Sequence, residues 1–323
     1  FYKQFIIIQK ANIYCKSLWK HHSKKLTKDI LHLWTSDRAE NSGEGKLARM
    51  FIKYLLDQYN YRIKFNTNQK RSYNKYTSPF IGILYCWKYY LKNKKIAYIN
   101  YLPLWNCFIF ILLPPKTILG PITGGAFFNK SNLLNYLVRK YLFPILYKIS
   151  EFFINIRSPH LIFSTDLLKR YLSNKTIKKS KFNFMFNDFV KKKMIKKKID
   201  FLIYYRKHKN KESFFPITFI RQLIKFKFKI SIIGDKLNIP SVKNYGIINS
   251  TKVCKLQAIS KYTIASGENP YSFFILECLS NNMKIIIEKK NKNQIKFYKD
   301  KFVGINFNDV KAFIKLKQKN FKL

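Results

Sequence analysis

Residues 266–277 of the chain read SGENPYSFFILE, and two acidic residues, Glu268 and Glu277, frame a loop and an apolar run. Acidic residues are scarce in this sequence, which holds 63 Lys and Arg against 16 Asp and Glu. A proline at position 270 suits the first turn of a helix, where its missing N–H leaves no bond unmade. We therefore predict a helix over Pro270–Leu279 and a strand over Tyr262–Ser266 before it.

The predicted start of this helix has a chemical use. Backbone N–H groups of Tyr271, Ser272 and Phe273 would face outward there, where an anion is favoured. Ionised carboxylates only accept hydrogen bonds, so Glu268 and Glu277 suit the hydroxyls of a sugar or a ribose. The alternative is that Glu268 only caps the helix and that Glu277 is an ordinary surface residue.

Short β-rich runs alternate with longer amphipathic runs on both sides of this segment, which predicts an α/β protein with parallel strands. In the N-terminal half we expect strands and helices at Ile30–Trp34, Lys46–Gln58, Tyr61–Phe65, Ile96–Tyr101, Leu104–Leu113, Lys116–Pro121, Leu133–Ile154, His160–Ser164 and Leu167–Leu172. In the C-terminal half we further expect them at Ile199–Tyr205, Phe219–Phe226, Lys229–Gly234 and Met283–Ile287.

The alternation of strands and helices restarts after a basic segment, which divides the chain into two domains. Residues 1–185 form a Rossmann-like N-terminal domain on the acceptor side, of which residues 1–28 are an extension without an assigned structure. Residues 186–198 include KKKMIKKK and are expected to be a basic linker. Residues 199–323 form a second Rossmann-like domain, whose last helix is expected to pack back on the first domain.

Three further loops follow predicted strands, at the sheet edge where open α/β proteins bind ligands. Arg206 and Lys211 occupy the first loop, and two cations there suit the charge of a departing diphosphate. The alternative is one more Lys-rich loop in a Lys-rich protein. The other two loops would let the backbone approach a ligand, or would form plain turns, at Gly43, Gly45, Thr123, Gly124 and Gly125.

The formal net charge of +47 fits a solvated Lys-rich surface, adhesion to an anionic membrane, or nucleic-acid binding. The chain is rich in Lys, Asn, Ile, Phe and Tyr together, as AT-rich coding produces, which raises Lys everywhere. A dedicated phosphate-reading surface would favour Arg, because its planar fork makes bidentate contacts. Specific nucleic-acid binding is therefore not expected.

The cysteines and the longest uncharged apolar run indicate in which compartment the protein is expected and whether it is expected to span a membrane. The five cysteines are scattered and form no CxxC pair or Cys/His cluster, so a reduced, cytoplasmic compartment is expected, without a metal site. Ile96–Leu113 is an uncharged stretch that meets the lower length of a membrane span. Asn and Pro interrupt it, so we favour a buried strand, a short apolar helix and another strand over a span.

The C-terminal half resembles the group 1 (family 4-like) glycosyltransferases of the GT-B fold. The matching features come in order: a strand, an Arg–x4–Lys loop, a helix, a strand ending in IIGD, an Asn- and Gly-containing stretch, and the paired glutamates. In the N-terminal half, SGEGKLARMF resembles the family's first glycine loop and helix, and HLIFSTDLLKRYL resembles its strand–Ser–helix segment. The resemblance covers roughly residues 30 to 290 and implies two Rossmann-like domains with a donor cleft between them.

The resemblance also implies roles for single residues. Arg206 and Lys211 match the basic pair that holds the nucleotide diphosphate, and Glu268 and Glu277 match the acids for the donor sugar and the ribose. Eight residues separate these glutamates, one more than is usual in the family, and no catalytic His is carried over, because Thr123 or a glycine stands in its place. Arg206, Lys211 and Glu268 are the expected catalytic residues. Further donor-binding residues are expected at Asn269, Tyr271, Ser272, Phe273 and Gly234, and acceptor-side loops at Gly43–Gly45 and Thr123–Gly125.

The implied function is a hexosyltransferase-like glycosyltransferase that moves a sugar from a nucleotide-diphosphate-sugar donor to a carbohydrate or lipid-linked glycan acceptor. Retention of configuration and a part in cell-surface polysaccharide or lipopolysaccharide synthesis would follow. No DxD motif is present, so neither a metal nor another cofactor is expected. A basic N-terminal domain suggests the anionic inner face of the cytoplasmic membrane as a further partner. The alternatives are a non-catalytic basic protein that binds nucleic acid or membrane, and a GT-B protein that binds its donor without transferring it.

Overall fold

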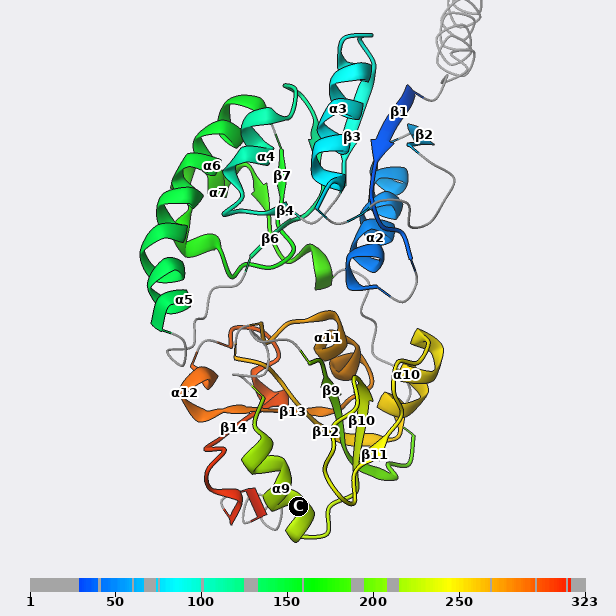
Figure 1. Ribbon diagram of the computed structural model, residues 1–323, viewed down its shortest axis with the longest axis vertical. Coiled ribbons are helices and arrows are strands. Elements are labelled where there is room, and N and C mark those ends of the chain that lie inside the picture. The colour runs from blue at the N-terminus through cyan, green and yellow to red at the C-terminus, as the bar shows by residue number, and fades with distance from the viewer. Residues whose placement is uncertain are drawn as a thin grey trace, which may run out of the picture.

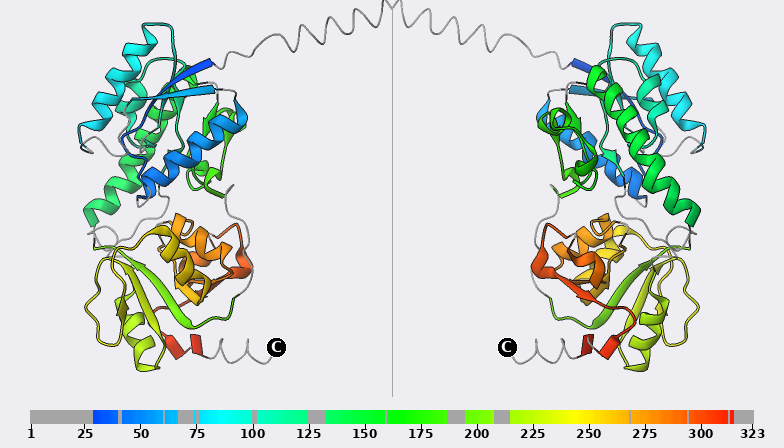
Figure 2. Two further views of the ribbon diagram at one scale, coloured as in Figure 1. Left: turned by 90° about the vertical axis from the view of Figure 1, so that its right-hand side faces the viewer. Right: turned by 90° about the vertical axis from the view of Figure 1, so that its left-hand side faces the viewer.

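The chain folds into two α/β domains, stacked along the long axis of the molecule (Figures 1 and 2). The computed structural model describes residues 29–39, 42–59, 61–66, 74, 76–99, 102–124, 133–158, 160–186, 195–207, 215–267, 269–293, 295–311 and 313–314. The predicted extension, most of the basic linker, Lys211, Glu268 and Gly125 lie outside the described residues.

The N-terminal domain is built on a parallel sheet with the strand order β2-β1-β3-β5. Its strands are β1 (Asp29–Trp34), β2 (Tyr61–Phe65), β3 (Lys95–Tyr98) and β5 (Ile118–Leu119). Two short parallel pairs extend it, β4 (Leu102–Pro103) with β6 (Ile122–Thr123) and β7 (Leu161–Ile162) with β8 (Ser180–Lys181).

Helices cover both faces of this sheet, because successive side chains of a strand point to opposite faces. Leu31 and Leu33 share a core with the first helix, whereas Trp34 shares a core with the helices of the other face. The helical segments are α2 (Gly43–Gln58), α3 (Ser78–Tyr90), α4 (Cys107–Leu112), α5 (Leu133–Leu137), the π-helix η1 (Val138–Leu142), α6 (Phe143–Arg157), η2 (Lys169–Tyr171), α7 (Asn174–Lys178) and η3 (Phe184–Phe186).

The C-terminal domain has a six-stranded parallel sheet in the order β11-β10-β9-β12-β13-β14. Numbered from the start of the domain this order is 3-2-1-4-5-6, the doubly wound order of Rossmann domains. The strands are β9 (Ile199–Tyr205), β10 (Ile230–Gly234), β11 (Lys243–Asn244), β12 (Ser260–Ile264), β13 (Lys284–Glu288) and β14 (Phe302–Ile305). The helices are α9 (Ile217–Lys225), α10 (Ser250–Ala258), α11 (Phe273–Ser280), α12 (Lys289–Lys292) and η4 (Lys299–Lys301).

The two domains share part of their apolar core at the end of the first domain. One continuous cluster of buried side chains includes Leu31 of β1, Phe184 of η3 and Tyr271 of the second domain. The ring of Phe186 lies 5.2 Å from that of Tyr271 and 5.4 Å from that of Phe297. An ion pair of 3.5 Å between Lys296 and Asp166 also joins the domains.

Lys197, in the segment expected to be a linker, binds two helix ends. Its ammonium donates to the carbonyls of Ala258, at the end of α10, and Asn281, just after α11, each at 2.9 Å. Cations stabilise helix C-termini because unpaired carbonyls give that end a partial negative charge. Burial lowers the pKa of Lys197. The end of the linker is therefore fixed on the second domain.

Several predicted elements have different bounds in the structure. The helix expected from Pro270 begins at Phe273, because the side chain of Ser272 caps it by accepting from the N–H of Ile275 at 3.5 Å. Pro270 lies in the preceding turn. The helix expected from Leu104 begins at Cys107, and the one expected over Leu167–Leu172 is a single 3-10 turn.

The uncharged stretch Ile96–Leu113 contains β3, β4 and α4, and β5 follows it, so the favoured strand–helix–strand interpretation is confirmed. In the part of the chain that the structure describes, no helix is long and apolar enough to cross a membrane. Near the C-terminus, Phe313 packs on Phe201 and Phe228 within the second domain, and the packing of a last helix on the first domain stays a prediction. Residues 315–323 lie outside the described part.

Candidate functional site

The loop after β1 is held by its own polar side chains. Ser42 caps α2, since its hydroxyl accepts from the N–H of Gly45 at 2.7 Å and donates to Asp37 at 2.5 Å. The guanidinium of Arg49 donates to the carbonyls of Arg38 and Ala39, at 2.8 and 2.5 Å. The predicted glycine loop is thus the first turn of a helix with a fixed entry.

Gly45 is required there because the backbone of Ala39 lies against it. A Cβ at Gly45 would come within 2.6 Å of the Ala39 nitrogen, whereas a Cβ at Gly43 would meet nothing within 4 Å. The glycine loop therefore brings two parts of the backbone together, and its assignment to the acceptor side stays a prediction.

The second predicted acceptor-side loop follows β6. The hydroxyl of Thr123 is buried and has no hydrogen-bond partner among the described residues. Gly124 packs against Leu168, whose Cδ1 would lie 2.7 Å from an added Cβ. The described structure uses this hydroxyl in no hydrogen bond, and the role of the loop in acceptor binding stays a prediction.

In the second domain, the predicted donor residues flank the point where the strand order reverses. β9 pairs with β10 on one side and with β12 on the other, so the loops after β9 and β12 diverge from neighbouring strands. In open α/β sheets, ligands bind in the crevice at this switch point. Arg206 follows β9 and is exposed, and the segment 265–277 follows β12.

Gly234 is the last residue of β10, the strand that pairs with β9. It has φ +98, and a Cβ there would collide with the carbonyl oxygen of Tyr205, its partner in register on β9. Asp235 accepts from the N–H of Lys207 at 2.7 Å and so ties the two loops together. These contacts fix the backbone beside Arg206. They give Gly234 a role in the fold, and its role in donor binding stays a prediction.

The segment SGENPYSFFILE divides into a buried anchor and a helix. Tyr271 is buried, and its hydroxyl accepts from the N–H groups of Lys296 and Phe297 and donates to the carbonyl of Phe297. The N–H of Tyr271 donates to the side chain of Asn269 at 3.1 Å. Tyr271 and Asn269 thus hold the turn in place, while Ser272 and Phe273 form the helix start.

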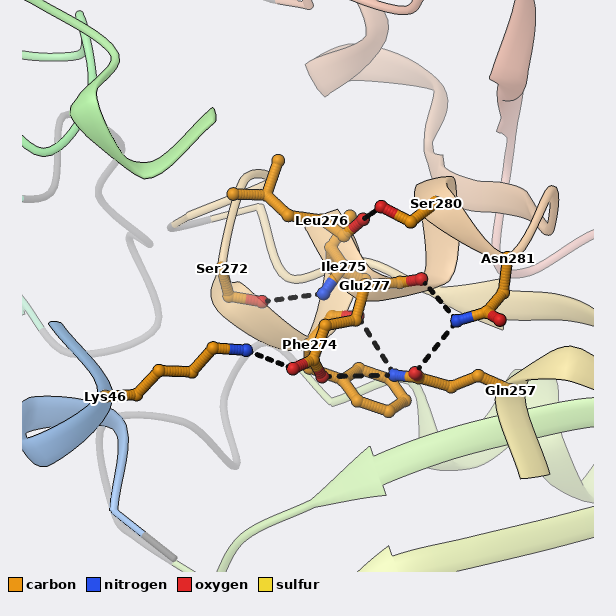
Figure 3. Close-up of polar contacts among 9 residues, drawn as sticks. All are labelled: Lys46, Gln257, Ser272, Phe274, Ile275, Leu276, Glu277, Ser280 and Asn281. Carbon is orange, nitrogen blue, oxygen red and sulfur yellow. Dashed lines mark hydrogen bonds and ion pairs between the residues drawn. The ribbon is translucent and has the colours of Figure 1, made fainter. Parts of the chain in front are cut away.

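Glu277 lies at the end of a chain of polar side chains (Figure 3). Gln257 donates to the Glu277 carboxylate and to the carbonyl of Phe274, each at 3.4 Å. Asn281 donates to Gln257 at 3.3 Å and to the Glu277 carbonyl at 2.8 Å. Side chains of the second domain therefore hold one carboxylate oxygen of Glu277 in place.

The other oxygen of Glu277 forms an ion pair with Lys46 of α2, across the boundary between the domains (Figure 3). Both side chains are partly buried, at 29% and 27% exposure. The Lys46 ammonium also lies 5.2 Å from the centre of the Phe273 ring, a cation–π distance. The glycine-loop helix of the first domain and the predicted donor helix of the second thus meet at one charge pair.

Lys46 is the site residue that sequence reasoning missed. A lysine attracts no notice in a chain with so many basic residues. The signal that could have found it is its place in the first turn of a helix, where the helix dipole disfavours a cation. A lysine at such a position is stabilised by an acidic partner, and here that partner is Glu277.

A pocket of about 320 Å³ in the N-terminal domain is separate from these residues. Its lining contains none of the predicted site residues and consists of Tyr54, Ile162, Lys181, Phe182 and Phe184. Lys181 donates to the Tyr54 hydroxyl at 3.2 Å, and this bond raises the pKa of Lys181. Glu277, by contrast, contacts Lys46 at the boundary between the domains.

The sequence matches no protein-family model and no curated protein. Solved structures do match. The Anabaena protein Alr3699/HepE in complex with UDP aligns over 90% of this chain and 91% of its own, with a TM-score of 0.51 at 12% identity. The chain has the GT-B fold.

Two further solved structures align with this chain over a similar length. The UDP-GlcNAc 2-epimerase of Methanocaldococcus jannaschii, in complex with UDP-GlcNAc and UDP, aligns over 90% of this chain and 92% of its own, at 12% identity and a TM-score of 0.49. A glycosyltransferase from Rickettsia africae ESF-5 aligns over 92% and 89%, at 13% identity and a TM-score of 0.47.

Proposed function

We propose that this GT-B protein is a glycosyltransferase that uses a nucleotide-diphosphate-sugar donor. The observation that carries the proposal is the position of Arg206 directly after β9 and of Glu277 in α11, the helix that follows β12, since β9 and β12 are the strands between which the order of the sheet reverses. One supplies an exposed cation and the other a positioned carboxylate. The GT-B neighbour Alr3699/HepE was solved with UDP, which makes UDP the first nucleotide to test.

In this proposal the two charges act on different parts of the donor. Arg206, with Lys211 by resemblance, neutralises the diphosphate as it departs, and the N-terminus of α11 adds its backbone dipoles. Glu277 accepts hydrogen bonds from the ribose hydroxyls, because Gln257 and Asn281 hold its carboxylate in place. Glu268 would contact the donor sugar.

Lys46 changes partner in this mechanism. Without a ligand it neutralises Glu277, and a ribose that takes the carboxylate displaces it. The released ammonium then faces the donor phosphates from the side of the first domain, where its charge is useful again. Donor binding would thus exchange one ion pair for another and connect the two domains through the ligand.

The acceptor and the stereochemistry rest on the resemblance of the motifs. A carbohydrate or lipid-linked glycan acceptor, retention of configuration, and a role in cell-surface polysaccharide or lipopolysaccharide synthesis belong to the proposal on that ground. The acceptor would approach the first domain near Gly43–Gly45 and Thr123–Gly125.

The test is binding of nucleoside diphosphates by the purified protein. UDP, GDP, ADP and CDP are screened by thermal shift, because a ligand of the native state raises the melting temperature. Calorimetric titration then measures affinity for the best nucleotide and for its nucleoside, which lacks phosphate. Arg206→Ala and Lys46→Ala should weaken the diphosphate about tenfold or more and leave the nucleoside unchanged, whereas Glu277→Gln should weaken both.

The matched controls lie elsewhere on the second domain. Arg221→Ala removes an exposed arginine of α9, and Asp300→Asn removes an exposed carboxylate, so neither should alter binding. A protein that binds none of the four nucleotides, or for which Arg206→Ala and Arg221→Ala behave alike, would overturn the proposal. Transfer of sugar from the matching labelled donor then separates an enzyme from a protein that only binds.

A further inference from the structure

The helix α6 is apolar on two opposite faces, and only one of them is used by the fold. Tyr147, Ser150 and Ile154 face inward, and Ser150 donates to the carbonyl of Leu104 at 2.6 Å. On the opposite face, Ile145 and Ile156 are 59% and 67% exposed. A helix that is apolar all round is normally buried in a protein core or in a membrane.

This outer stripe follows the helical period and continues on neighbouring segments. It comprises Ile145, Ile149, Phe152 and Ile156 of α6, with Leu134 and Leu137 of α5 and Tyr141 and Leu142 of η1 before them. On α4, which packs against α6, Phe108 and Leu112 lie one turn apart and are also exposed. We call these side chains the outer stripe.

Acidic residues are nearly absent from the part of the sequence that carries the outer stripe. Between Asp57 and Asp166 the sequence contains a single acidic residue, Glu151. Glu151 is buried and its carboxylate is already paired, since it accepts from the N–H of Ser173 at 2.6 Å and from the ammonium of Lys148 at 3.1 Å. Lys140 is exposed on the same helical run, and Lys148 is exposed there too but forms the ion pair with Glu151.

We propose that the outer stripe docks the N-terminal domain on an anionic lipid bilayer. Apolar side chains enter the boundary between headgroups and acyl chains, while flanking lysines pair with lipid phosphates. A second copy of this chain is a poorer occupant, because it would bring Lys140 against the same cation of its partner, with hardly any acidic residue in this part of the sequence to compensate. The charge pattern thus selects a negative surface.

What this docking means for the acceptor rests on the proposed function. The helical run starts at α5, at the end of the first domain that faces the second domain (Figures 1 and 2). A domain lying on this stripe would hold its boundary with the second domain close to the bilayer. A lipid-linked acceptor could then reach the donor residues without leaving the membrane.

The test is co-sedimentation of the full chain with vesicles, made of phosphatidylcholine alone or mixed with phosphatidylglycerol. The wild-type protein should bind the mixed vesicles, and high salt should weaken this binding. The double variant Ile145→Gln/Ile156→Gln should lose roughly tenfold or more in vesicle affinity, because less apolar surface is inserted. Glutamine is a good helix former, so α6 should persist.

A matched double variant, Ile195→Gln/Ile247→Gln, makes the same change at two exposed isoleucines outside the outer stripe. It should bind vesicles like the wild type. Equal binding by both double variants would overturn the proposal, since charge alone would then account for adhesion. A stable dimer in light scattering that only Ile145→Gln/Ile156→Gln dissolves would also overturn it, in favour of a second copy.

These measurements need no nucleotide, so they stand apart from the test of the proposed function. Ile145→Gln/Ile156→Gln should bind nucleoside diphosphates as the wild type does. Vesicle binding in a protein that binds no nucleotide would support the docking surface alone.

Discussion

Gly45 shows how one missing side chain shapes the entrance to the site. The loop after β1 folds back so closely that the Ala39 backbone occupies the place of a Cβ. Ser42 and Arg49 then fasten the loop, and the next residue, Lys46, points to the second domain. A shift of this loop would therefore move the cation that reaches Glu277.

Gly45→Ala should destabilise the protein by roughly 1–3 kcal/mol, as overpacking of a close contact does. Gly43→Ala is the matched control, because nothing lies within 4 Å of its added Cβ. It should be neutral or slightly stabilising, since alanine reduces the entropy of the unfolded chain. Thermal unfolding measures both, and a Gly45→Ala variant as stable as Gly43→Ala would contradict the packing argument.

Single residues were the hardest part to predict from sequence. The pattern of strand ends and loops identifies Arg206 and Glu277 as candidates, and the structure has Arg206 directly after β9 and Glu277 in α11, which follows β12. That pattern does not identify the partner of Glu277, because Lys46 is 231 residues away and resembles many other lysines. Ion pairs between domains depend on tertiary arrangement, which local sequence does not carry.

At the scale of elements, the link between α6 and α7 depends on the buried acid Glu151. Its carboxylate accepts from the N–H of Ser173, the N-cap of α7, and from Lys148 at 3.1 Å. Burial favours the neutral acid, but hydrogen bonds from Thr176, Ser173 and Lys148 outweigh it and lower the pKa of Glu151. The charged form is therefore the one that holds the two helices together.

The stability that Glu151 contributes should depend on pH. Since its pKa is lowered on folding, the contribution is present above the ordinary value of 4.5 and is lost as pH falls through the folded pKa. Glu151→Gln should cost about 1–3 kcal/mol near neutral pH and progressively less in acid. Melting temperatures of both proteins across this range test it, and a constant difference would contradict it.

Sequence patterns located most elements and failed where packing overrides composition. β2 and β9 have the bounds that the runs predict, because their apolar residues are continuous or alternate clearly. The helix α3 was not predicted, since SPFIGILYCWKYY is rich in aromatic and β-branched residues that favour strands. Gly82 allows this helix to pack closely on Trp34 of β1, whose Cδ1 would lie 2.6 Å from a Cβ there.

At the scale of the molecule, the two domains behave as one packed body at their junction. The cluster that joins Leu31, Phe184 and Tyr271 crosses the boundary that the sequence predicts at residue 186. Composition indicates a boundary there because basic residues follow. It gives no sign that Phe186 itself packs between the rings of Tyr271 and Phe297.

Calorimetry should therefore show a single unfolding transition for the wild-type chain, in spite of its two sheets. Phe186→Ala should lower stability by roughly 1–3 kcal/mol, less than a fully buried Phe would, and separate the transition into two. Phe80→Ala, at an exposed position of α3, is the control and should leave one transition. Two transitions in the wild type would refute the shared core.

The shared core also has a consequence for how the protein is made. A ribosome releases the first domain well before Tyr271, Phe297 and Phe302, which complete the packing around η3. Until those residues emerge, the nascent chain carries an unfinished apolar surface at Phe184 and Phe186, of the kind that chaperones bind. The last third of the sequence thus acts as a folding partner for the first domain during synthesis.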